Sequence, residues 1–139
     1  MKKFLVFFLL LSLGFNQSKV TIQDNEIEIN DNEAVVEVFG MVCSMCAFGI
    51  GEGFSKTNFI DKSKFTDGVL VDVDAQYVQL GLLDSKNVNP EKIVQVIEDA
   101  GYDVNLLFIL QNEKLTKLST DKLGILQPIA FNFISYNNN

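Results

Sequence analysis

Two cysteines, Cys43 and Cys46, are the residues of this chain whose side chains are best suited to chemistry. They are the only cysteines in 139 residues, and the chain contains no histidine. The lack of histidine excludes Ser-His-Asp and Cys-His catalysis and removes imidazole from any metal site. A Cys-x-x-Cys pair can bind a metal ion, exchange electrons as a dithiol and a disulfide, or close a passive disulfide. The spacing alone does not choose among these three roles.

The position of the pair in the chain favours metal binding. Residues 40–46 connect a predicted strand with a predicted helix that begins near Cys46. Because a thiolate at a helix N-terminus is stabilised by the helix dipole and by free backbone N–H groups, we expect Cys46 to ionise more readily than a free thiol. Cys43 is expected in the exposed loop before the helix. Two soft thiolates suit monovalent copper, or a thiophilic ion such as mercury(II), rather than magnesium or calcium.

Other types of site fit the sequence less well. A structural zinc ion or an iron–sulfur cluster usually takes four ligands, and this chain offers two thiolates. Met45 lies between the cysteines and could add a soft thioether ligand, although an exposed loop methionine is the commoner outcome. The glycines at 49, 51 and 53 lack the spacing of a dinucleotide-binding fingerprint.

The elements around the pair follow a regular order. Apolar residues alternate in three segments, recur at helical spacing in two, and form one continuous apolar run. The order is strand, helix, strand, strand, helix, strand, which predicts a ferredoxin-like βαββαβ sandwich of the α+β class. Two helices would then cover one face of a four-stranded antiparallel sheet. The expected ranges are 34–39, 46–54, 69–73, 77–83, 90–100 and 104–110.

The second helix has the clearest limits. Asn89 is a good N-cap, Pro90 suits the first helical position, and Gly101 stands where a left-handed C-cap is expected. The first helix contains three glycines, and each is unfavourable by roughly 1 kcal/mol relative to alanine in a helix interior. Its stability must therefore come from packing.

Four segments are predicted along the chain: a signal peptide over 1–14, a linker over 15–32, the compact domain over 33–110 and a C-terminal extension over 111–139. Lys2 and Lys3 precede an apolar run that is shorter than the roughly 20 residues of a membrane-spanning helix. We expect cleavage near Gly14, export to the periplasm or the medium, and no stable membrane insertion afterwards. In the extension we expect a short helix around 115–126, which Pro128 ends, and a strand over 129–136.

The charge of the chain excludes one class of partner. The formal net charge is −7, and every basic residue is a lysine. Because phosphate binding depends on clustered basic side chains, such an acidic surface repels nucleic acid and anionic lipid. We therefore expect no nucleic-acid partner.

Two segments resemble the heavy-metal-associated domain family: Gly40-Met41-Val42-Cys43-Ser44-Met45-Cys46 and Glu98-Asp99-Ala100-Gly101-Tyr102. That family includes copper chaperones, N-terminal domains of copper-transporting P-type ATPases and periplasmic mercury-binding proteins. The resemblance covers residues 33–109. It implies that Cys43 and Cys46 are the metal ligands, that Met41 is a core residue supporting the loop, and that Tyr102 packs beside the loop. With its predicted signal peptide, the chain looks most like the periplasmic members.

The chain departs from the family pattern in three places. Val42 stands where the family commonly has threonine, which affects hydrogen bonding in the loop more than ligation. The segment between the first helix and the second strand is longer than usual. The extension over 111–139 has no counterpart in the family.

The sequence therefore predicts an exported protein, not an enzyme, that holds a soft metal ion between two thiolates and passes it to a partner. The expected partner is a metal-transporting membrane protein or another metal-binding domain. A thiol–disulfide redox module is the alternative, although thioredoxin-like domains carry their cysteines on a different order of strands and helices. A metal-free interaction domain that uses the linker and the extension is a third hypothesis.

Overall fold

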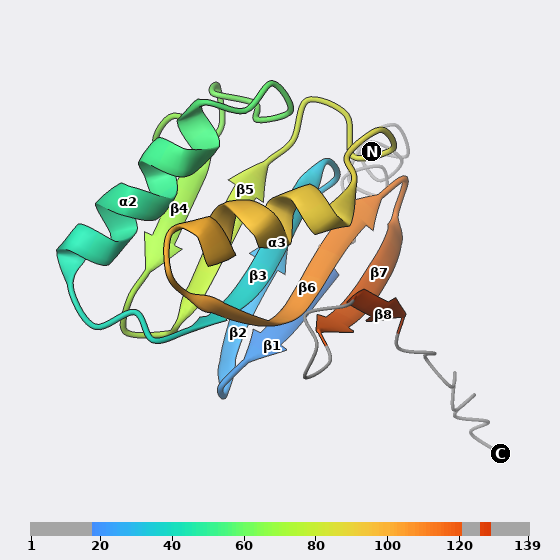
Figure 1. Cartoon of the computed structure of the whole chain (residues 1–139). Coiled ribbons are helices and arrows are strands. Elements are labelled where there is room, and N and C mark those ends of the chain that lie inside the picture. The colour runs from blue at the N-terminus through green and yellow to red at the C-terminus, as the bar shows by residue number, and fades with distance from the viewer. Residues whose placement is uncertain (1–17, 121–125, 129–139) are drawn as a thin grey trace, which may run out of the picture.

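The structure is a computed structural model that describes residues 18–120 and 126–128 (Figure 1). Its central unit has the predicted order of elements, and its strands are neighbours in the order β4-β5-β3-β6, all antiparallel. Both helices lie on one face of this sheet, so the predicted α+β arrangement is confirmed. The signal peptide predicted over 1–14 lies outside the described residues. The elements are β3 (Glu33–Phe39), α2 (Ser44–Ser55), β4 (Val69–Asp72), β5 (Tyr77–Gly81), α3 (Pro90–Asp99) and β6 (Asp103–Gln111).

The sheet is wider than the predicted four strands. Two further strands, β7 (Lys114–Thr120) and β8 (Leu126–Pro128), extend it beyond β6 to six strands. The helix predicted around 115–126 is therefore wrong. Asn112 and Glu113 both have positive φ, 48° and 61°, as in the two-residue turn of a tight hairpin. That turn returns the chain along β6, where pairing satisfies the backbone groups of an edge that would otherwise be free. The strand predicted over 129–136 lies outside the described residues.

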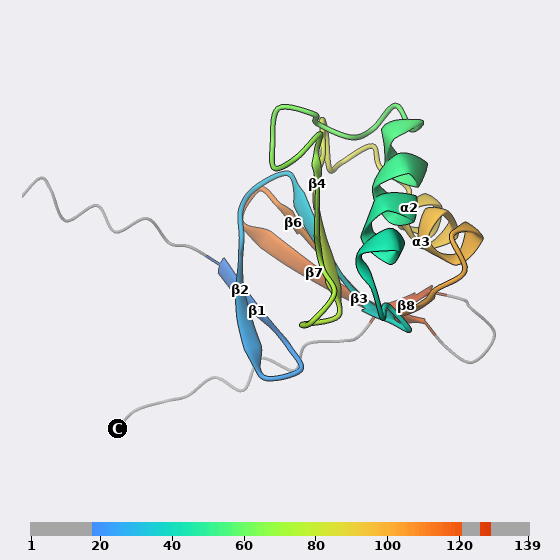
Figure 2. The same cartoon turned by 90° about the vertical axis from the view of Figure 1, so that its left-hand side faces the viewer.

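The linker predicted over 15–32 is also wrong for residues 18–29. They form a hairpin of β1 (Ser18–Ile22) and β2 (Asn25–Ile29), which lies on the face of the sheet opposite the helices (Figure 2). Because successive side chains of a strand point to opposite sides, two alternate residues of each strand are buried against the sheet. This second core contains Val20, Ile22, Ile27, Ile29, Val35, Phe108 and Leu110.

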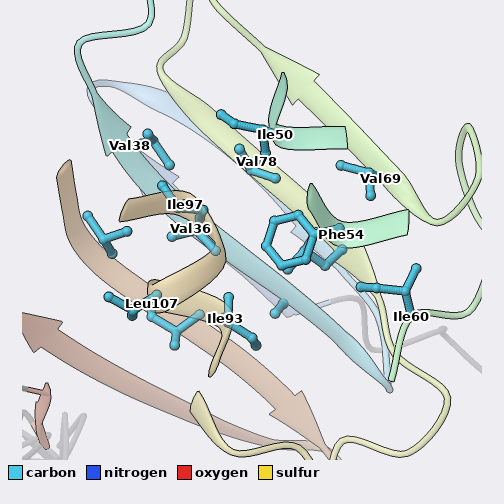
Figure 3. Packing of buried hydrophobic residues seen from close by; sticks show 14 of the residues in the cluster. Val36, Val38, Ile50, Phe54, Ile60, Val69, Val78, Ile93, Ile97 and Leu107 are labelled. Carbon is cyan, nitrogen blue, oxygen red and sulfur yellow. The ribbon is translucent and has the colours of Figure 1, made fainter. Parts of the chain in front are cut away.

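The main core lies between the helices and the sheet (Figure 3). Phe54 of α2 is fully buried at its centre and meets the ring of Phe59 edge-on, with the centroids 6.4 Å apart. Met41 and Cys46 belong to the same cluster. The loop that carries the cysteines is thus attached to the core at both ends.

A buried carboxylate connects the hairpin, the sheet and the long loop that follows α2. Glu33 of β3 pairs with the Lys64 ammonium at 3.1 Å and accepts hydrogen bonds from the Asn30 backbone N–H and the Gln79 side chain. These partners are required because a buried charge without them would be strongly destabilising.

The limits of α3 and the contact between the two helices follow from particular residues. The Asn89 side chain accepts a hydrogen bond from the Glu91 backbone N–H, and Gly101 follows α3 with a φ of +93°. Gly53 lies where α2 meets α3, since a Cβ there would be 3.0 Å from Val96 Cγ1.

Among the described residues, no helix is both long enough and apolar enough to cross a membrane.

Candidate metal centre

The cysteine loop begins where β3 ends. Gly40 follows Phe39 with a φ of +91°, a conformation that glycine adopts without the steric cost of a Cβ. The chain then turns toward α2, whose N-cap is Cys43 in an extended conformation. The Cys46 backbone N–H donates to the Cys43 carbonyl at 3.0 Å, so the two cysteines stand one turn apart on the entry to the helix.

The structure brings the two predicted ligands together. The sulfur atoms of Cys43 and Cys46 are 3.5 Å apart, and both cysteines are free thiols. Cys43 is exposed, whereas Cys46 is only 5% exposed and belongs to the main core. One sulfur is therefore accessible from solvent, and the other is held by the packing of α2.

The surroundings of Cys46 favour its thiolate. A hydrogen bond from the Tyr102 hydroxyl is the largest cause that lowers the pKa of Cys46, to about 7. The backbone amide of Val42 lowers that pKa further, as do the amide and the thiol of Cys43, while burial opposes them. The same hydrogen bond to Cys46, together with burial and the two nearby thiols, raises the pKa of Tyr102. The expected ease of ionisation of Cys46 thus has a local cause in the loop and in Tyr102.

Tyr102 lies beside the cysteine loop, just after the C-terminal end of α3. It follows Gly101, and its backbone N–H donates to the Ile97 carbonyl at 3.3 Å. Its ring lies beside Gly40, because a Cβ built on Gly40 would be 3.9 Å from Tyr102 Cδ1. Tyr102 therefore lies beside the loop, at the place the family resemblance implies.

The two methionines of the loop differ in their surroundings. Met41 is 2% exposed and lies in the main core, whereas Met45 is 72% exposed in the first turn of α2. Val42 and Phe48 are also largely exposed, so three apolar side chains close to Cys43 in the sequence are open to solvent.

A residue that the sequence did not single out also contacts the loop. Gln76, in the turn between β4 and β5, donates from its side-chain nitrogen to the carbonyls of Met41 and Val73, both at 2.5 Å. The sequence marks Gln76 as a turn residue only. Nothing in a turn motif indicates a contact with a residue 35 positions earlier.

The donor set of the site is small. Within residues 18–120 and 126–128, no three or more cysteine, aspartate or glutamate side chains gather at a point where they could hold a metal ion. The site therefore offers two thiolates and no carboxylate. A groove of about 520 Å³ lies between α2 and β4, and neither cysteine lines it. Its lining residues are Ala47, Phe48, Gly51, Glu52, Ser55, Thr66, Asp67, Val69, Leu70 and Val71.

No family model matches the chain. No curated protein matches it either. Among solved structures, the chain is similar to the CopZ metallochaperone, with 24% identity, a TM-score of 0.44, and coverage of 52% of this chain and 97% of that protein. For a copper binding domain from HMA7, a P-type ATPase, the identity is 23%, the TM-score 0.44 and the coverage 52% and 89%. For the candidate copper-ion-binding protein from Bacillus anthracis str. Ames, the identity is 31% and the TM-score is 0.43. That match covers 54% of this chain and 100% of the solved chain.

In each of these matches, most or all of the solved chain is covered. Two of the three names state copper binding, and the third is that of a metallochaperone.

Proposed function

We propose that this protein binds one soft metal ion, with copper(I) as the preferred cargo, between the thiolates of Cys43 and Cys46. The observation that carries the proposal is the pair of sulfur atoms 3.5 Å apart at the N-terminus of α2. Thiolates are soft ligands, and a set of two without imidazole or carboxylate favours copper(I) over harder ions. Copper is also the metal named for two of the similar solved structures. Mercury(II) would be held by the same two atoms.

The different exposure of the two sulfurs suggests an order of exchange. Each thiol gives up its proton when it binds the ion, and the lowered pKa of Cys46 makes that step easier near neutral pH. A partner's thiolate can reach the ion first on the side of the exposed Cys43 and replace it as a ligand, and buried Cys46 is released last. The ion keeps its charge throughout, and no covalent bond of a substrate is broken. The protein is therefore proposed to be a carrier and not an enzyme.

The proposed recipient is a metal-transporting membrane protein or another metal-binding domain. Two of the similar solved structures are a metallochaperone and a domain of a P-type ATPase, which correspond to the two sides of such a transfer. We further propose that the carrier acts outside the cytoplasm, on the basis of Lys2, Lys3 and the apolar run that follows them.

Anaerobic titration with copper(I), in competition with a chromophoric chelator, tests this function. We expect one ion per monomer in the wild-type protein and loss of that binding in Cys43→Ser and in Cys46→Ser. Met45→Leu is the matched control, because Met45 is an exposed sulfur residue in the same turn and should leave the affinity unchanged. Equal affinities in the wild type and the two serine variants would contradict the proposal.

A thiol–disulfide exchange function remains the second candidate, since two free sulfurs at 3.5 Å and a thiol with a pKa of about 7 also suit that chemistry. Reduction of insulin distinguishes the two candidates. A carrier should show little turnover in this assay, whereas a redox module should approach the rate of a dedicated oxidoreductase.

A further inference from the structure

The turn between β4 and β5 reaches across to the cysteine loop through a single side chain. The amide nitrogen of Gln76 is 2.5 Å from the carbonyl oxygens of both Met41 and Val73, so each of its two N–H groups has an acceptor. The Gln76 backbone carbonyl also accepts from the Val38 N–H at 2.9 Å, which holds the turn against β3. Gln76 is thus held by hydrogen bonds at both its backbone carbonyl and its side-chain amide.

The bond from Gln76 is made to the peptide unit that joins Met41 to Val42, directly before the cysteine pair. A peptide group is planar and trans, so the Met41 C=O and the Val42 N–H point in opposite directions. The carbonyl is held by Gln76, and the Val42 N–H on the other side of the same peptide unit begins the segment that carries Cys43 and Cys46. The direction of that N–H therefore depends on the direction of the carbonyl that Gln76 holds.

We infer that Gln76 is a positioning residue of the cysteine site: it holds the Met41 carbonyl and thereby fixes the orientation of the peptide unit that leads into Cys43. The consequence for metal release rests on the proposed function, and the consequence for the loop does not.

The loop needs a support of this kind because it provides little of its own. Cys43, the N-cap of α2, makes no side-chain hydrogen bond to the helix, and the Val42 side chain has no polar group. Among the described residues, Gln76 supplies the side-chain hydrogen bond that is made to residues 40–42.

Two substitutions separate the hydrogen bond from the packing. Gln76→Asn tolerates a positive φ but is too short to reach the Met41 carbonyl. Gln76→Glu keeps the length and replaces the two donors with an acceptor that faces two carbonyl oxygens. Both retain the backbone bond to Val38. The matched control is Gln23→Asn, the same change at a residue of similar φ, 44°, in the turn between β1 and β2.

The main measurement is the nuclear magnetic resonance of the Val42 amide proton in the reduced, metal-free protein. We expect an upfield shift and faster hydrogen exchange of this proton in both Gln76 variants, and no change in Gln23→Asn. Copper(I) should leave the two variants about three- to tenfold faster than the wild type in a chelator chase, as for the loss of one hydrogen bond. A melting temperature close to that of the wild type shows that the loop, and not the fold, has changed.

An unchanged Val42 amide in Gln76→Asn would overturn the positioning role, even if Gln76→Glu perturbed it, because repulsion by a carboxylate would then be the cause. An equal shift in Gln23→Asn would also overturn it. If the wild-type protein itself bound no copper(I), the proposed function would fail, while the Val42 resonance would still decide the role of Gln76.

Discussion

At the scale of single residues, the site is asymmetric. Cys43 is exposed and Cys46 is buried, yet the hydrogen bonds that stabilise a negative sulfur converge on Cys46. Tyr102 is the largest of these contributions and comes from the far end of α3. The buried thiol can therefore hold charge near neutral pH without being open to solvent. In the proposed function, the exposed Cys43 is the thiol that is free to exchange.

Replacement of Tyr102 by phenylalanine should make the Cys46 thiol less acidic. The hydroxyl lowers the pKa of Cys46 to about 7, so its loss raises that pKa and reduces the thiolate fraction at neutral pH. Because the thiolate is the nucleophile, alkylation of Cys46 at pH 7 should be about fivefold slower and recover at higher pH. Peptide mapping of iodoacetamide labelling against pH measures this. Tyr77→Phe, the same change away from the site, is the control, and identical pH profiles for wild type and Tyr102→Phe would contradict the assignment.

At the scale of elements, α2 combines a weak helical sequence with an important position. It begins at the cysteine pair and buries Cys46, Ile50 and Phe54 at helical spacing. Its glycines have different surroundings: Gly53 is packed against Val96 of α3, whereas a Cβ on Gly49 would meet nothing within 4 Å. The close approach of α3 explains why position 53 is a glycine, although glycine is unfavourable in a helix. Nothing in the structure explains the glycine at position 49.

Gly49→Ala should stabilise the protein. The added methyl group meets open space, and alanine is favoured over glycine in a helix interior by about 1 kcal/mol. Urea denaturation of the reduced protein measures the free energy of unfolding. Gly53→Ala is the matched comparison and should gain less or lose stability, since its Cβ would be 3.0 Å from Val96 Cγ1. A loss of stability in Gly49→Ala would show that α2 is not a regular helix at this position.

At the scale of the whole molecule, the sheet is covered on both faces. The helices cover one face and the β1–β2 hairpin covers the other, where Val35 and Phe108 are buried (Figure 2). The cysteine site belongs to the helix face through Met41 and Cys46. The hairpin therefore contributes to stability from the side of the sheet that the site does not use.

Ile29→Ala should destabilise the fold and leave metal binding intact. Ile29 of β2 is fully buried between the hairpin and the sheet, and truncation of such a side chain usually costs about 2–5 kcal/mol. Thermal or urea unfolding should show this loss, while copper(I) affinity at low temperature stays at the wild-type value. Leu83→Ala, at an exposed leucine, should change neither quantity much. A weaker metal affinity in Ile29→Ala would show that the two faces of the sheet are coupled.

Local signals in the sequence determined the helix α3, the loop before α2 and the pairing of Cys43 with Cys46. Asn89, Pro90 and Gly101 act on their own neighbours in the chain, and two cysteines three positions apart at a helix start are close whatever the rest of the chain does. For that reason these features could be predicted from residue types and spacing.

The tertiary structure alone decided the remaining features. Residues 18–29 have an alternating pattern that a linker can also show. They become a packed hairpin because β3 and β6 present apolar side chains on the face of the sheet opposite the helices. Leu115 and Leu118 have helical spacing, but pairing with β6 makes their segment a strand. Gln76 and Met41 are 35 positions apart, and the register of β5 against β3 brings them together. Contacts of this kind depend on how distant segments pack, which no local pattern of residues contains.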